Sequence, residues 1–131
     1  MKMIIDKKNL ENAKFDYFEA NNTNLSISIN LCNKIDLEIM FSNILKYVYR
    51  SDNNLISEIA EKTNNELEQS LFLKEALSKF YMDDHRGYPD IPKDHPFRLF
   101  LITTVDKTSL FEIVAESITM NFKDKNERSC S

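Results

Sequence analysis

The clearest pattern in the chain is an unbroken alternation of apolar and polar residues from Leu25 to Leu31. Successive side chains of a strand point to opposite sides, so the apolar members of this run would share one buried face. Residues 15–19 are strand-like as well, and the turn-forming residues 21–24 separate the two stretches. The pattern predicts a β-hairpin near the N-terminus.

Farther along the chain, apolar residues recur at steps of three and four, which is the spacing expected on one face of a helix. Four stretches show this spacing, namely residues 37–48, 55–60, 66–81 and 107–120. The last of them follows Asp106, a residue suited to capping a helix N-terminus. The pattern therefore predicts four helices.

A short apolar run at residues 97–105 is β-prone and predicts one more buried strand. The order of elements indicates the fold class α+β, in which a small, mostly antiparallel sheet packs against about four helices. The sheet would consist of the N-terminal hairpin plus the strand near 97–105. A chain of 131 residues fits a single domain, 1–131, with a polar, frayed C-terminal tail from about residue 123.

The composition is that of an ordinary globular protein, with 42% hydrophobic and 29% charged residues. A single glycine, Gly87, is unusual. Phosphate-binding loops of the P-loop and Rossmann types need several glycines, so this composition excludes them. Tight turns have to use Asn and Asp, which tolerate the left-handed backbone region better than other residues with a Cβ.

Cysteine usage and hydropathy bear on the cellular compartment. Cys32 ends an apolar run and Cys130 lies in a polar tail, which is typical of free thiols in a reducing compartment. Asp6 interrupts the N-terminus before any signal-like apolar segment, and no stretch approaches the roughly 18 apolar residues of a membrane span. We expect a cytoplasmic protein that does not contact membranes.

The segment from Met82 to Pro96 has the greatest concentration of chemically active residues. It holds Gly87, all three prolines and both histidines, each histidine next to an aspartate. A carboxylate beside an imidazole suits metal binding or acid–base catalysis. However, the ten-residue spacing of His85 and His95 fits no zinc or EF-hand pattern. We therefore expect a surface loop, with no catalytic residue, metal or cofactor.

The negative charge is concentrated in the middle of the chain. Residues 52–94 carry ten acidic and five basic side chains, whereas residues 1–51 carry six and seven and residues 95–131 carry five of each. This excess accounts for the net charge of −4 and disfavours nucleic-acid binding, which depends on Lys and Arg. It forms either a solvated helix face or a surface that steers a basic partner.

In its size, acidity and lack of a catalytic constellation, the chain resembles the immunity proteins of contact-dependent growth inhibition and related bacterial toxin systems. The resemblance covers no motif, so no family residue can be transferred. It implies a non-enzymatic protein, a monomer or small homo-oligomer, that neutralises a cognate basic, nuclease-type toxin by direct contact. Under this hypothesis the partner-binding residues come from the acidic segment: Asp83, Asp84, Tyr88, Asp90, Asp94, Glu66, Glu68 and Glu75.

Two other classes of protein stay open. A secretion-type chaperone is also small and acidic, and it would bind an effector segment through exposed apolar surface, usually as a dimer. A small hydrolase or metal enzyme would use the His85–His95 loop.

Overall fold

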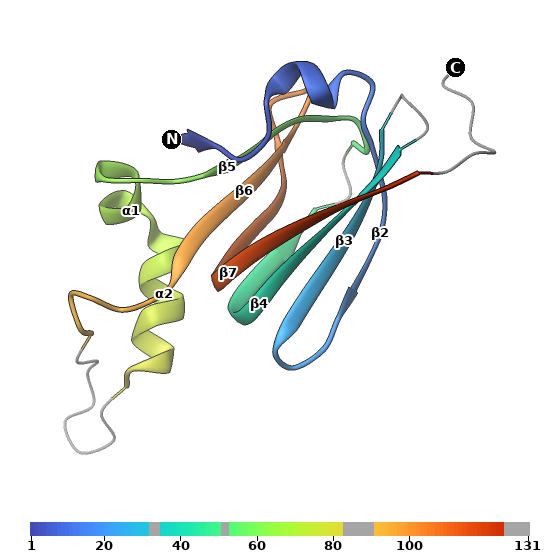
Figure 1. Ribbon diagram of the computed structural model, residues 1–131. Coiled ribbons are helices and arrows are strands. Elements are labelled where there is room, and N and C mark those ends of the chain that lie inside the picture. The colour runs from blue at the N-terminus through green and yellow to red at the C-terminus, as the bar shows by residue number, and fades with distance from the viewer. Residues whose placement is uncertain (32–34, 51–52, 83–90, 125–131) are drawn as a thin grey trace.

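The computed structural model describes residues 1–31, 35–50, 53–82 and 91–124, and these build one seven-stranded antiparallel sheet with little helix (Figure 1). The strands are β1 (Lys2–Met3), β2 (Lys14–Ala20), β3 (Asn24–Asn30), β4 (Ile35–Tyr49), β5 (Ile56–Glu61), β6 (Arg98–Thr104) and β7 (Ser109–Asp124). Their order across the sheet is β1-β5-β6-β7-β4-β3-β2. The helices are the 3-10 turn η1 (Lys7–Leu10), α1 (Asn65–Gln69) and α2 (Leu71–Phe80).

The predicted fold class, a small sheet packed against about four helices, is therefore wrong. The hairpin prediction is confirmed, because β2 and β3 pair antiparallel over their length. The Asn21 side chain orders the turn between them, accepting hydrogen bonds from the backbone N–H groups of Thr23 (2.9 Å) and Asn24 (2.8 Å). The strand predicted near 97–105 is confirmed as β6.

The long strands β4 and β7 join two halves of the sheet. β3 pairs with β4 only from Asp36 to Ser42, whereas β6 pairs with β7 only as far as Ala115. The ribbon bends between these regions, where Asn43 has a positive φ of 54° and the register shifts between Ile44 and Lys46. Such a bulge inserts an extra residue and turns the strand, so the two halves lie across each other (Figure 1).

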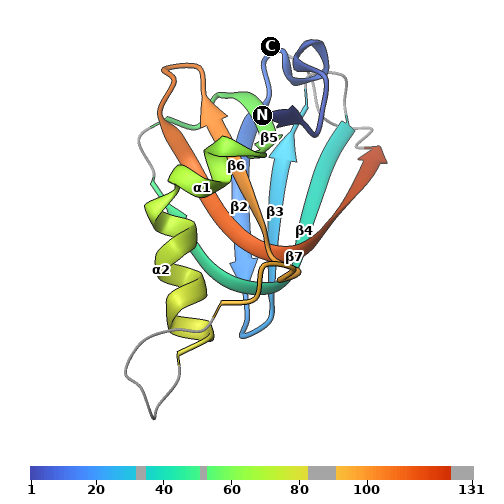
Figure 2. The same ribbon diagram turned by 90° about the vertical axis from the view of Figure 1, so that its left-hand side faces the viewer.

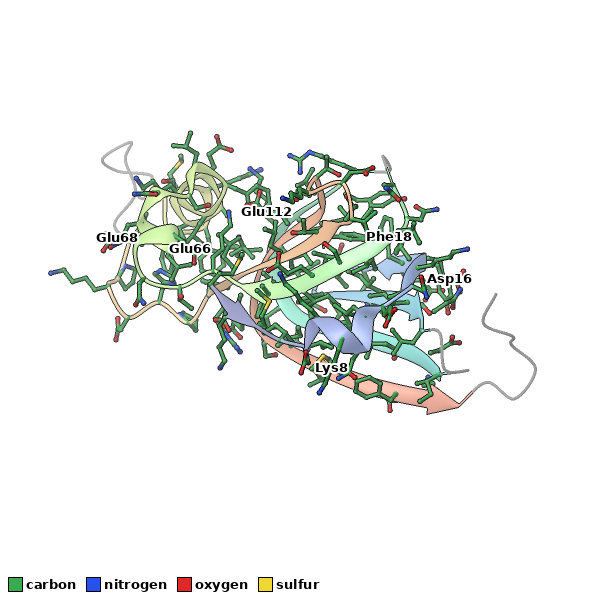
Figure 3. All side chains as sticks on the ribbon, turned by 90° about the horizontal axis from the view of Figure 1, so that it is seen from above. Lys8, Asp16, Phe18, Glu66, Glu68 and Glu112 are labelled. Atoms are coloured by element: carbon green, nitrogen blue, oxygen red, sulfur yellow. The ribbon has the colours of Figure 1, made fainter. Side chains whose placement is uncertain are left out.

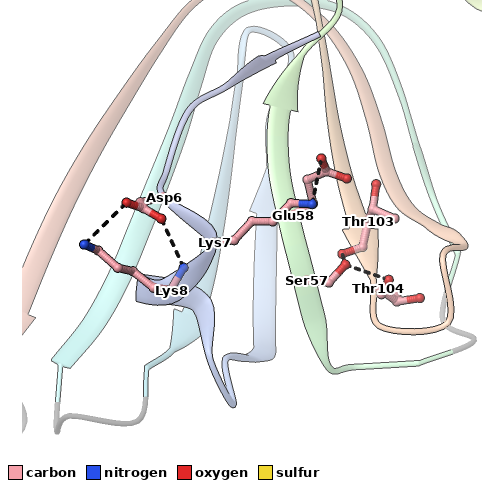
Figure 4. Close-up of polar contacts among 7 residues, drawn as sticks. All are labelled: Asp6, Lys7, Lys8, Ser57, Glu58, Thr103 and Thr104. Atoms are coloured by element: carbon pink, nitrogen blue, oxygen red, sulfur yellow. Dashed lines mark hydrogen bonds and ion pairs between the residues drawn. The ribbon is translucent and has the colours of Figure 1, made fainter.

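The two halves meet again at the opposite corner. The Phe15 N–H donates to the Asn54 carbonyl (2.7 Å) and the Ile56 N–H donates to the Ala13 carbonyl (2.9 Å), which joins the start of β2 to the start of β5. Figure 4 shows how η1 is held nearby: the Lys8 N–H bonds to Asp6, and the Lys7 ammonium lies 3.9 Å from the Glu58 carboxylate on β5. This corner closes one side of the main core.

The main core fills the space between the two halves of the sheet, and a smaller core lies on the outer face. The Phe111 ring is at the centre of the first, with aromatic neighbours at 4.9–5.6 Å from β2 and β4. In the second, α2 packs on the outside of the sheet (Figure 2). Its buried residues are Leu73, Ala76 and Leu77 of α2 with Phe97, Leu99 and Val114.

The helix predicted over residues 37–48 is most of strand β4. Leu37, Ile39 and Phe41 are buried in the main core at every second position, as in any half-buried strand. The phase changes at the bulge, where Ile44 packs against the main core three positions after Phe41 and Leu45 packs against the second core on the opposite face. This shift converts a two-residue repeat into spacings of three and four, which mimic a helix.

The helices predicted over residues 55–60 and 107–120 are wrong for related physical reasons. The first is β5, where a register shift separates the buried Ile56 and Ile59 by three positions. The second is β7, which is covered on both faces at its middle, by the main core at Ile113 and by α2 at Val114. A strand buried on both faces shows consecutive apolar residues rather than alternation.

The helix predicted over residues 66–81 is present but broken in two. Ser70 is extended (φ −77°, ψ 113°), and its Oγ accepts a hydrogen bond from the Leu73 N–H at 3.1 Å, which caps α2. Helix α1 is the short turn before this cap. Within the described parts of the chain, no helix has the length and apolar character needed to cross a membrane.

Candidate docking site at helix α2

The structure describes half of the residues predicted to bind a partner. Asp83, Asp84, Tyr88 and Asp90 lie outside the described residues. Glu66 and Glu68 lie on α1, Glu75 lies on α2, and Asp94 is exposed in the segment that leads to β6. Figure 3 shows Glu66 and Glu68 at the opposite end of the view from Asp16 and Phe18 on β2.

Two of these carboxylates are engaged within the molecule. The Glu66 Oε1 lies 2.8 Å from the N-terminal amine, and the hydrogen bond from this amine lowers the Glu66 pKa. The Glu75 Oε2 lies 2.9 Å from the Lys46 Nζ on β4. Among the described residues, Glu68 and Asp94 are the predicted carboxylates without an ion pair. The acidic segment is therefore a partly neutralised surface, which the sequence does not reveal.

A groove of about 490 Å³ runs between α2 and β4. The Lys46 ammonium lies at its side, paired with Glu75 and 4.8 Å from the centre of the Phe72 ring. These contacts hold a lysine stem against apolar surface while leaving its charge near solvent. The lining residues are Leu45, Lys46, Glu75, Ala76, Lys79 and Phe80.

At the end of the groove, Phe80 is 56% exposed yet firmly packed. Its ring lies edge-on to those of Tyr81 and Phe97, at centroid distances of 4.9 and 5.1 Å. Met82, two residues on, is 55% exposed. Apolar side chains that are exposed but already fixed lose little conformational entropy when a partner covers them. Phe80 lies within the helical spacing of residues 66–81, which favours a buried position, but the structure places it at the surface.

The groove follows an open edge of the sheet. β3 leaves β4 at Ser42, and among the described strands none pairs with β4 from Lys46 to Tyr49 on the side away from β7. Helix α2 covers the neighbouring outer face through contacts with Leu45 and Val114. A strand edge beside a helix is the arrangement that domains use to accept extended segments.

The described part of the His85–His95 loop has a local structural role. The Nδ1 of His95 accepts a hydrogen bond from the Phe97 N–H at 3.3 Å, and its ring is stacked on that of Phe97 at 6.3 Å. His85, Cys32 and Cys130 lie outside the described residues. Within the described ranges, no group of three His, Cys, Asp or Glu residues could hold a metal ion.

Away from the groove, Glu61 and Arg98 form a two-pronged ion pair between β5 and β6. The Arg98 Nε and Nη2 donate to the two Glu61 carboxylate oxygens at 2.9 and 2.8 Å, and the guanidinium lies 5.0 Å from the Phe100 ring centre. The hydrogen bonds from Arg98 are the main cause of a Glu61 pKa below its ordinary value of 4.5. The pair ties the neighbouring strands β5 and β6 together.

We expect Glu61→Gln to lower the free energy of unfolding at pH 7 by about 1 kcal/mol, because it removes a partly exposed, well-aligned ion pair. The pKa of Glu61 is lower in the folded protein than in the unfolded chain, so the ion pair stabilises the fold fully at pH values above the unfolded-state pKa. This stabilisation is lost as the pH falls through the folded-state pKa. The variant should therefore lose less stability than the wild type below about pH 4.5. Urea titrations from pH 7 to pH 3 measure this difference, with Glu68→Gln as the control. If acidification lowered the free energy of unfolding of the wild type and of Glu61→Gln equally, the stabilising role of this ion pair would be contradicted.

Comparison with protein-family models, with curated proteins and with solved structures finds no match for this chain.

Proposed function

We propose that the protein is a cytoplasmic immunity protein, which neutralises a basic, nuclease-type toxin domain by direct contact through the face formed by α2 and β4. The observation that carries this proposal is the ring of Phe80, which is exposed to solvent but already packed against the ring of Phe97. It lies at a groove that is lined in part by charged side chains. Protein interfaces typically combine a desolvated apolar or aromatic centre with a polar rim, and a few anchor residues dominate their energy.

In this arrangement a partner side chain fills the groove next to Phe80, and the carboxylates of Glu68 and Asp94 meet Lys or Arg of the partner. Both carboxylates are exposed and have no ion pair among the described residues. A carboxylate buried by a partner without a cationic mate is costly, so the interface favours a basic partner over a neutral or acidic one. Glu66 and Glu75, which are already paired, contribute less.

We expect Phe80→Ala to weaken binding to the toxin at least about tenfold, because truncation of a buried aromatic anchor costs on the order of 1–2 kcal/mol or more. The proposal predicts that a neighbouring gene encodes a basic toxin domain, and this domain is the probe. Calorimetry gives the affinity, and growth of cells that co-express both proteins gives the neutralisation. Val105→Ala is the matched control, since Val105 is 50% exposed at the turn between β6 and β7. Unchanged affinity and unchanged protection with a folded Phe80→Ala protein would refute this interface.

The chaperone alternative is favoured by one observation, the open edge of β4 beside α2. A chaperone of this kind would bind an unfolded, extended effector segment, whereas an immunity protein binds a folded toxin domain. Binding of the same toxin domain before and after urea unfolding separates the two functions. We expect affinity for the folded domain only, and affinity for the unfolded chain would favour the chaperone.

A further inference from the structure

The second half of β7 is also an open edge of the sheet, separate from the docking groove. β6 pairs with β7 only as far as Ala115, so from Glu116 to Asp124 the strand pairs with β4 alone among the described residues (Figure 1). An edge strand of this length presents a row of unpaired backbone donors and acceptors, which is a template for another strand.

This edge also exposes apolar side chains. Met120 is opposite Ile39 and Phe122 is opposite Leu37, which places both on the face of the main core. They are nevertheless 37% and 53% exposed, because β6 does not continue beside them. Proteins usually protect such edges with charges or proline. Here Lys123 is the only basic residue of the stretch, and its Nζ lies 3.3 Å from the Glu38 carboxylate on the neighbouring strand.

We propose that a second copy of the chain covers this edge, with the two β7 strands paired antiparallel around a two-fold axis at Met120. Met120 is the midpoint of the open stretch, so this register gives every residue of the stretch a partner. It sets Phe122 opposite Ile118 of the other copy, an aromatic and β-branched pair that stabilises antiparallel strands. The two sheets become one continuous sheet.

Neighbouring registers are less favourable. A register shifted by one residue would pair even-numbered positions of one copy with odd-numbered positions of the other. The apolar residues of each copy would then lie opposite polar residues of its partner. A shift of two residues sets either Phe122 opposite Glu116 or Ile118 opposite Asp124. The pairing centred on Met120 keeps these apolar residues together and sets the like-charged Glu116 and Asp124 opposite one another only at its two ends. Because the contact is the same on both copies, it closes as a dimer and does not propagate into a fibre.

The test is the mass of the full chain by sedimentation equilibrium. We expect the wild type to have twice the 15.4 kDa of the chain at high micromolar concentration. Met120→Lys and Met120→Glu should each be monomeric, because each sets two like charges opposite one another at the two-fold axis. An equimolar mixture of the two variants should recover the dimer, since Lys then faces Glu. Val105→Lys, at a site that is 50% exposed and remote from this edge, should stay dimeric.

Three results would overturn the proposal. These are a wild type that stays at 15.4 kDa, a Met120→Lys protein that stays dimeric, and a mixture of folded variants that stays monomeric. Circular dichroism of each variant establishes that it is folded. Recovery in the mixture cannot come from a general defect of either variant, so it ties the dimer to Met120.

Discussion

Replacement of Phe111 by alanine is expected to lower the free energy of unfolding by about 3–5 kcal/mol. The Phe111 ring is completely buried, and it contacts the rings of Phe15 (5.6 Å), Phe18 (5.3 Å) and Tyr49 (4.9 Å). These neighbours come from β2 and β4, so the ring fills the space where the two halves of the sheet cross. Its loss leaves a cavity that rigid strands cannot close.

Chemical denaturation of the purified protein measures this effect, with Phe111→Leu as the matched control. Leucine keeps most of the buried volume and should cost less than about 1.5 kcal/mol. A domain of this size has a total stability of about 5–15 kcal/mol, so the alanine variant should show a clearly lower midpoint. A loss below about 1 kcal/mol for the alanine variant would mean that Phe111 does not hold the two halves together.

The second large effect is expected at Asn43, where β4 turns between the two halves of the sheet. Asn43 has φ 54°, and its Nδ2 donates a hydrogen bond of 2.6 Å to the Glu116 carboxylate on β7. Valine disfavours the left-handed region and lacks the donor, so Asn43→Val should cost about 2–3 kcal/mol. Asn43→Gly also loses the donor but accepts the positive φ, so it should cost about 1 kcal/mol or less.

The difference between the two variants isolates the backbone conformation, because both remove the same hydrogen bond. Denaturation midpoints of the two proteins, measured side by side, give this difference directly. Equal losses for Val and Gly would show that the positive φ at the bend contributes nothing to stability.

Several elements of the fold could be predicted because their signals are local. The alternation through β3, the Asn-rich turn before it and the apolar run of β6 each lie within one element. Among the described residues with positive φ, Asn12, Asn43 and Asn64 fit the expectation that Asn takes the place of Gly, although Asn43 lies within β4, whereas Lys107 in the turn between β6 and β7 departs from it. In each case the residue type and the local conformation are linked by short-range sterics.

The strands β4, β5 and β7 could not be recognised from periodicity, because their signals depend on tertiary structure. Bulges in β4 and β5 change the phase of the buried face, and α2 buries the second face of β7. The three-residue step from Phe41 to Ile44, both at the main core, arises from that change of phase. A sequence pattern records which residues are buried, and it does not record how many faces of the sheet are covered.

The candidate site was predicted only in part. Helix α2 lies within the acidic segment of residues 52–94, as its sequence position requires. The pairing of Glu75 with Lys46 could not be predicted, because it joins residues 29 positions apart. The exposure of Phe80 depends on where α2 lies on the sheet, because Leu73, Ala76 and Leu77 occupy the face that packs. The helical pattern alone assigned Phe80 to the buried stripe.

Hydrogen exchange of the chain, free and bound to the basic toxin domain that the proposed function predicts, tests the proposed interface most directly. We expect binding to slow exchange in α2 and in β4 from Ile44 to Tyr49, because these elements line the groove. Exchange in the 3-10 turn η1, which lies beside β5 at the opposite corner of the sheet and lines no part of the groove, should not change. Slowed exchange at that turn, with α2 unaffected, would contradict the account.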